Sequence, residues 1–280
     1  MNNGFWRRFR RNRAALAGAA ILALVALCAL AAPWLAGNDP WAMVQQPFLR
    51  PGAFAGLPMG SDALGRDVAA GLLYGARVSM LIGLTATAVA LLLGIGLGAT
   101  AGYHGGWVDA WLMRFTELFQ AVPGFAFAVV LVAIFQPSVQ SIVAAIAIVS
   151  WPPVARLVRG EFLTLRGREF VAAAQLAGQS SARIIFTQIL PNAASPIVVM
   201  GSLMVASSIL LESALSFLGL GDPNVMSWGY MVGAARTALR QAWWVAMFPG
   251  LAIMLTVLSL NLVGEGLADG LNARLDGRTR

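Results

Sequence analysis

Side chains that usually carry chemistry are scarce in this chain. Its 280 residues include no Lys, a single His (His104) and a single Cys (Cys28). A phosphate-binding P-loop requires a Lys that reaches the β- and γ-phosphates, and a Schiff base requires a Lys amine, so we expect neither. One His does not build a His-cluster metal site, and one Cys forms no internal disulfide. We therefore expect no catalytic residue, no metal site and no cofactor in the chain.

One carboxylate stands out by its position. Glu212 is the only charged residue in the apolar run Ile197–Leu220. An ionisable side chain in the middle of a membrane costs about 2.5–3.5 kcal/mol on insertion scales, and it is a functional candidate by default. Two interpretations stay open: a pathway or gating residue, or a structural residue that pairs with an Arg or a backbone group.

The second candidate is an Arg-rich segment that joins two apolar runs. Good helix formers over Glu169–Ala177 predict a helix, and Gly178 suits its C-terminus. Residues Ala182–Ile189 predict a second short helix, after which Pro191 fits the first turn of the next apolar run. The segment is thus predicted to form a helical elbow. Physically, it is either an amphipathic helix held on anionic lipid by its Arg side chains or a docking element for another protein.

The elements that position these residues follow from composition. The chain is 59% hydrophobic and 11% charged, with a mean hydropathy of +0.75, whereas soluble domains are about 45–50% apolar and about 25% charged. A soluble globular fold and a disordered chain are therefore both disfavoured. Six apolar runs are long enough to cross a bilayer as helices: Ala14–Leu35, Val78–Gly102, Leu118–Phe135, Val139–Ala155, Ile197–Leu220 and Ala242–Gly264. We predict an all-α, multi-pass membrane protein with six transmembrane helices.

The Arg distribution predicts the orientation of these helices. With the N-terminus in the cytoplasm, fourteen of the nineteen Arg fall on cytoplasmic segments and five on the opposite side, as the positive-inside rule favours. Both termini are therefore predicted to be cytoplasmic. The net charge of +7 comes from Arg between long apolar runs, which indicates contact with the lipid bilayer rather than with nucleic acid. The first run is longer than a cleaved signal sequence, so we expect it to stay as a span.

Small residues recur at helical spacing in the second run. Gly94, Gly98 and Gly102 form two overlapping Gly-x-x-x-Gly steps. In membrane helices such steps let two backbones approach closely, so we expect a helix-packing face here.

The elbow resembles the EAA motif of ABC importer permeases. That motif is Glu-Ala-Ala, three residues, Gly, nine residues, a branched apolar residue, one residue, and then Leu-Pro. The residues on the motif are Ala173, Ala174, Gly178, Leu190 and Pro191. Two positions depart from it, because Ala172 stands at the Glu position and Gln188 at the branched apolar position. Glu169, one turn earlier, is a candidate replacement for the missing carboxylate.

Four further segments sharpen the resemblance. They are Gly60–Asp67, Leu73–Ser79, Trp151–Arg159 and Leu210–Gly221. They resemble the permeases of dipeptide, oligopeptide, nickel and glutathione importers, and most of all the shorter second permease of those systems. The resemblance covers essentially the whole chain.

The resemblance implies a type I ABC importer permease fold, with a peripheral helix beside a five-helix core, in the bacterial inner membrane. It implies four partners besides lipid: a second homologous permease in a heterodimer, two cytoplasmic ATPase subunits and an extracytoplasmic substrate-binding protein. The ATPases hydrolyse ATP, and residues 157–195 couple them to transport. The implied substrate is a di- or oligopeptide, with nickel or glutathione as alternatives.

The implied organisation has four parts. Residues 1–36 form a cytoplasmic N-terminus and the first span, and residues 37–77 form an extracytoplasmic loop. Residues 78–266 form the core, and residues 267–280 form a cytoplasmic tail.

A self-sufficient secondary transporter is the rival interpretation. Such a transporter would usually show several ionisable groups within its spans or inverted repeats, and only Glu212 is present. A membrane-embedded enzyme is a third interpretation. We do not expect it, because it would need paired carboxylates, a catalytic His or a metal site.

Overall fold

The computed structural model describes residues 9–37 and 39–276, and over these residues the regular elements are helices. The only β-type pairing described is two isolated bridges, Met43 with Arg66 and Ser61 with Asp67. The elements in chain order are α2 (Arg13–Leu35), α3 (Val68–His104), α4 (Gly106–Gln120), α5 (Gly124–Phe135), α6 (Val139–Arg166), α7 (Glu169–Leu176), α8 (Ser181–Arg183), the π-helical segment η1 (Ile184–Ile189), α9 (Leu190–Leu215), the π-helical segment η2 (Ser216–Leu220), α10 (Trp228–Ala235) and α11 (Trp243–Asp276).

Five helical stretches among the described residues are long and apolar enough to cross a membrane. They are α2, α3, α6, the continuous stretch from α8 to η2, and most of α11, and the bent pair α4 and α5 makes a sixth if it counts as one span. The predicted all-α, multi-pass class is confirmed. α2 is the least buried of the five and packs against α11, as expected of a peripheral helix.

The predicted continuous span Leu118–Phe135 is wrong. The chain bends by 80° between α4 and α5. Pro123 occupies the N-cap of α5 with φ −55° and ψ 123°. A proline has no backbone N–H to donate, and its ring pushes the preceding residue out of the helical region, so the helix ends before it.

Other helices extend beyond their predicted limits. α3 begins ten residues before Val78, because the Asp67 side chain caps it by accepting the N–H of Ala69 at 2.8 Å. α6 continues through Pro152 and Pro153 to Arg166. The beginning of α3 thus lies within residues 37–77, which were predicted as a loop. The end of α6 and the beginning of α9 lie within the predicted coupling segment, residues 157–195. Hydropathy locates the apolar centre of a helix, whereas caps decide where it ends.

The predicted second short helix of the elbow, Ala182–Ile189, is only partly correct. The chain is helical there, but it does not break before Pro191. Instead α8, η1, α9 and η2 join into one 40-residue stretch, Ser181–Leu220, which we call the rod. The π-helical turns of η1 lie directly before Pro191, where the backbone lacks one N–H.

The Gly-x-x-x-Gly face of α3 packs against α6, as predicted. A Cβ atom at Gly94 would lie 2.9 Å from the carbonyl oxygen of Trp151, and one at Gly102 would lie 2.6 Å from Cβ of Phe162. At Gly98 it would lie 2.9 Å from Cβ of Val158 and meet the carbonyl oxygen of Ala155. Only glycine permits this approach, which we call the α3–α6 seam.

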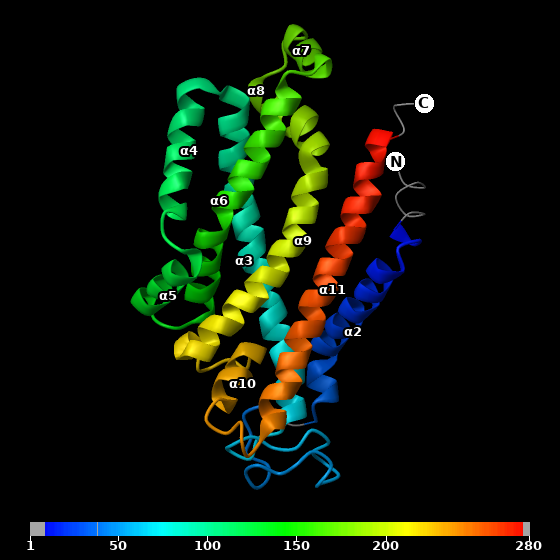
Figure 1. The fold of residues 1–280 in the computed structure, drawn as a ribbon, viewed down its shortest axis with the longest axis vertical. Coiled ribbons are helices and arrows are strands. Elements are labelled where there is room, and N and C mark those ends of the chain that lie inside the picture. The colour runs from blue at the N-terminus through cyan, green and yellow to red at the C-terminus, as the bar shows by residue number, and fades with distance from the viewer. Residues whose placement is uncertain (1–8, 38, 277–280) are drawn as a thin grey trace.

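The two ends of the molecule are distinct (Figure 1). The elbow with α7 lies at one end, the end of α11 points toward that end, and α2 begins on the same side, closer to the middle of the molecule. Residues 39–67, which we call the cap, and α10 lie at the opposite end. The rod therefore connects the elbow to the neighbourhood of α10.

The seam generates a prediction with an internal control. Replacing Gly98 by Val should destabilise the detergent-solubilised protein by roughly 1–3 kcal/mol, the usual cost of overpacking a close contact. Gly96 lies on the exposed side of the same helix, with no heavy atom within 4 Å of its missing Cβ. Gly96→Ala should be neutral or stabilising by up to about 1 kcal/mol, through helix propensity. Thermal unfolding measures both, and equal behaviour of the two variants would contradict the seam.

Candidate functional site

The elbow presents one buried and one exposed face on α7. Val171 is fully buried and Ala174 is 7% exposed, in a core cluster shared with α6, η1 and α9. The opposite face carries Glu169, Ala172 and Ala173, all exposed, and ends in Leu176. The Leu176 side chain is 91% exposed although it is apolar. Phe170 and Phe186 of the elbow are also exposed, by 37% and 66%. A group of exposed apolar side chains, rather than one alone, is typical of a surface that contacts another protein or lipid.

The predicted turn at Gly178 is confirmed. Its φ is +75°, in the left-handed region that favours glycine. The N–H of Gly178 donates to the carbonyl of Gln175 at 2.9 Å, and the N–H of Gln179 donates to the carbonyl of Ala174 at 3.1 Å. These two bonds make a Schellman motif that ends α7 and reverses the chain. No atom lies within 4 Å of the missing Cβ, so the backbone conformation, and not space, selects glycine.

The motif residues meet at one end of the molecule. Ile184 and Ile189 of η1 are fully buried beside Val171, so the two arms of the elbow share a core. Leu190 is half-buried against this core, and Pro191 is exposed. Glu169 lies on the same exposed face as Ala172, one turn earlier, where a carboxylate from either position would reach a common partner.

The end of α3 is fixed to the elbow side of α6. Arg159 of α6 forms a bidentate ion pair with Asp109 of α4, with 2.6 Å between Nη2 and Oδ2. Arg166, in the last turn of α6, donates to the carbonyls of Gly102 and Tyr103 at 3.3 and 3.2 Å. A cation at a helix C-terminus is favourable, and it satisfies carbonyls that the helix leaves free. These contacts hold three helices together beneath the elbow.

Glu212 is buried at the other end of the rod, with 1% of its surface exposed. Its Oε1 accepts hydrogen bonds from the hydroxyls of Ser216, at 2.9 Å, and Ser227, at 2.8 Å. The Ser213 hydroxyl lies 3.4 Å from Oε2. The structural interpretation named an Arg or a backbone group as partner, whereas the groups found here are serine hydroxyls. One of them, Ser227, belongs to the N-terminus of α10.

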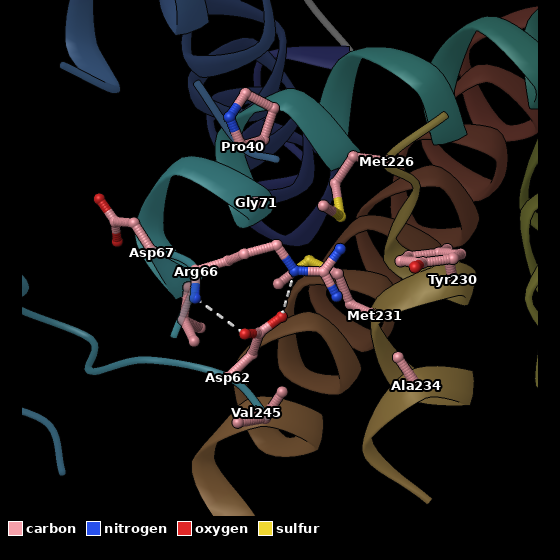
Figure 2. Close-up of a pocket in the computed structure, with 11 residues that line it drawn as sticks. Pro40, Asp62, Arg66, Asp67, Gly71, Met226, Tyr230, Met231, Ala234 and Val245 are labelled. Atoms are coloured by element: carbon pink, nitrogen blue, oxygen red, sulfur yellow. Dashed lines mark hydrogen bonds and ion pairs between the residues drawn. The ribbon is translucent and has the colours of Figure 1, made fainter. Parts of the chain in front are cut away.

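A second buried charge, in the cap, was not singled out from the sequence. The Arg66 side chain forms an ion pair with Asp62, with 2.6 Å between Nε and Oδ2 (Figure 2). Its Cζ lies 5.2 Å from the ring centroid of Trp41 and 5.9 Å from that of Tyr230. Burial lowers the pKa of Arg66, but Tyr230 and the Asp62 carboxylate outweigh it and leave the pKa above its ordinary value. The one signal for Arg66 in the sequence was its place in the segment Gly60–Asp67, which carries the family resemblance. Its contacts to the rings of Trp41 and Tyr230 could not be predicted from neighbouring residues.

Two hollows adjoin this cluster. The cavity in Figure 2 has a volume of about 20 Å³, enough for about one water molecule, and lies between Arg66, Met226 and Met231. A more open cavity of about 490 Å³ lies beside it, lined by Trp41 and Tyr74 among other residues.

Comparison with known proteins adds family information. Residues 94–277 match the family model of the binding-protein-dependent transport system inner membrane component. Residues 3–51 match the N-terminal TM domain of oligopeptide transport permease C.

Curated relatives match over nearly the whole chain. The di/tripeptide transport system permease protein DppC of Pseudomonas aeruginosa is 41% identical, over 97% of this chain and 91% of the relative. The glutathione transport system permease protein GsiD of Pectobacterium atrosepticum is 39% identical, over 97% of this chain and 90% of the relative.

Solved structures share the fold. A chain of the MetNI methionine ABC transporter, in an inward-facing conformation, superposes with a TM-score of 0.58 at 13% identity, over 75% of this chain and 97% of that one. An amino acid ABC transporter superposes with a TM-score of 0.54 at 13% identity, over 71% and 92%. The fold is that of ABC importer permeases. With a family model that covers most of its length and relatives above 35% identity, the chain belongs to the family of binding-protein-dependent transport system inner membrane components.

Proposed function

We propose that this chain is the transmembrane permease subunit of an ATP-driven importer for di- or oligopeptides. The observation that carries the proposal is the elbow: a rigidly capped α7 that exposes an apolar tip, in a chain similar throughout to dipeptide permeases. Glutathione is a second candidate substrate, because permeases named for it are 39% identical. Glutathione is itself a tripeptide, so one substrate class covers both.

The proposal includes partners and an orientation. Two ATPase subunits lie on the cytoplasmic side, where they bind the elbow of this chain and that of the second permease, and an extracytoplasmic binding protein delivers substrate to the cap. A second homologous permease completes the pathway, so that the transporter contains a heterodimer in the bacterial inner membrane. Both termini are cytoplasmic. Support comes from the Arg distribution and from the position of the elbow on the same side as the start of α2 and the end of α11 (Figure 1).

The proposed mechanism is alternating access. ATP binding closes the ATPases and draws the elbows together, the spans open toward the binding protein, and hydrolysis reverses both changes. A partner shifts such an equilibrium only if it contacts the two states differently. Residues 168–191 are the proposed contact, and the core helices from α3 to α11 line half of the pathway.

The exposed tip of α7 gives the first test. Leu176→Asp should weaken ATPase binding by about 30-fold or more, because burying a charge at an apolar interface anchor costs about 2 kcal/mol or more. The stability of the chain alone should hardly change, since Leu176 makes little internal contact. Co-purification of the ATPase subunits and peptide uptake measure the effect, with Leu176→Met as the control. Normal ATPase binding with Leu176→Asp would exclude this face as the docking surface.

The missing motif carboxylate gives the second test. If Glu169 replaces it, Glu169→Ala should reduce ATPase co-purification, and adding Ala172→Glu to that variant should restore it. Both positions are exposed on one face of α7, so neither change should affect folding. A double variant that stays as defective as Glu169→Ala would rule out the exchange.

The orientation is tested by labelling single cysteines in a Cys28→Ser background. Ala55 in the cap and Ala177 in the elbow are both exposed alanines, so Cys replaces each with little disturbance. An impermeant maleimide added to spheroplasts should label the Cys at 55 and leave the Cys at 177 unlabelled until the membrane is opened. The reverse pattern would invert the topology and exclude import by this mechanism.

A further inference from the structure

The short helix α10 lies where three parts of the molecule meet. Its first residue, Trp228, donates from its backbone N–H to the Ser79 hydroxyl of α3 at 3.1 Å, and from its indole Nε1 to the carbonyl of Leu72 at 2.9 Å. The Tyr230 ring lies 5.4 Å from that of Trp41 in the cap. α10 therefore belongs mechanically to the cap and to the beginning of α3.

The same helix packs without a gap on the end of the rod. A Cβ atom at Gly229 would lie 2.7 Å from Cα of Ser213, and one at Gly233 would lie 2.8 Å from the carbonyl oxygen of Ser216. Two glycines four residues apart thus give α10 a flat face against α9 and η2. Glycine contacts alone offer little resistance to sliding, because they carry no directional bond.

Two side-chain hydrogen bonds cross this face. The exposed Arg236, at the C-terminus of α10, donates to the carbonyl of Phe217 in η2 at 3.4 Å, and Ser227 forms the buried one with Glu212. The Ser227 hydroxyl donates to Glu212 Oε1 at 2.8 Å and accepts the N–H of Tyr230 at 3.0 Å, so it caps α10 and holds the carboxylate simultaneously. Both residues are buried, at 4% and 1% exposure. A hydrogen bond in a dry site is electrostatically stronger than one in water, because the local dielectric is low.

We propose that Glu212 is a positioning residue of the transport cycle, and that its hydrogen bond to Ser227 makes α10 and the cap move together with the rod. The opposite end of the rod is the elbow, so the bond links the extracytoplasmic surface to the ATPase contact. This inference rests on the proposed import function. It concerns coupling, and it requires a hydrogen-bond acceptor at position 212 rather than a charge.

The chain supplies a matched pair of serines for the test. Ser216 and Ser227 donate to the same Glu212 oxygen, at 2.9 and 2.8 Å, and are 5% and 4% exposed. Ser216 lies on the rod itself, whereas Ser227 lies on α10. If the bond to α10 matters, Ser227→Ala should impair coupling and Ser216→Ala should not.

The experiment uses the complete transporter reconstituted in lipid nanodiscs, with ATPase activity measured with and without loaded binding protein. Ser227→Ala and Glu212→Leu should each lower the stimulation by binding protein about fivefold or more, the lower range of allosteric coupling factors. Basal ATPase activity and subunit stoichiometry should not change. Glu212→Gln, which keeps the acceptor oxygen, and Ser227→Thr, which keeps the hydroxyl, should retain stimulation.

Glu212→Leu removes the Ser227–Glu212 hydrogen bond but leaves the Ser227 hydroxyl able to accept the N–H of Tyr230 at the N-terminus of α10. This variant therefore separates the loss of the bond to the rod from the loss of helix capping. The double variant that combines Ser227→Ala with Glu212→Leu should lose no more stimulation than either single variant, because both changes remove the same bond. The proposal is overturned if Ser216→Ala is as defective as Ser227→Ala, if Glu212→Gln is as defective as Glu212→Leu, or if basal activity falls in parallel. Absence of stimulation in the unmodified transporter would instead overturn the proposed function.

Discussion

The close approach of α3 and α6 is the constraint on which the rest of the structure depends. Lipid offers no hydrophobic drive for two apolar helices to associate, so they associate through packing and through polar groups at their ends. Three glycines of α3 supply the packing. At one end, Arg166 of α6 donates to the last carbonyls of α3, and Arg159 of α6 pairs with Asp109 of α4, the helix that directly follows α3. Once this pair is fixed, the cap before α3 and the elbow after α6 are each held by a rigid support.

The features that local sequence could predict are those in which one residue type satisfies a backbone requirement. Gly178 ends α7 because an αL position favours glycine, and the glycines of α3 form a seam because their spacing places them on one face. Both requirements can be read from a few neighbouring residues. The same holds for the helical class of the protein, since long uncharged runs have no other stable way to cross a bilayer.

The features that escaped prediction depend on partners far away in the sequence. Arg66 lies against Tyr230, 164 positions later, and Glu212 meets Ser227 only because the chain reverses through Gly219 and Gly221. The break before α5 was missed for another reason. A hydropathy run averages over Pro123, although a single proline that starts a new helix outweighs the apolar residues around it.

The rod is irregular near both of its ends and regular between them. At the elbow the short α8 is followed by π-helical turns and then by Pro191, where one backbone N–H is missing. At the other end a second π-helical segment stops at Gly219, with φ +86°, and a buried carboxylate fixes the neighbouring helix. Between them α9 forms a regular helix interrupted only by Pro196 near its start. The irregular turns of the rod therefore lie near its two ends, at a proline and at a glycine with π-helical turns beside them, which are the usual places where a helix bends.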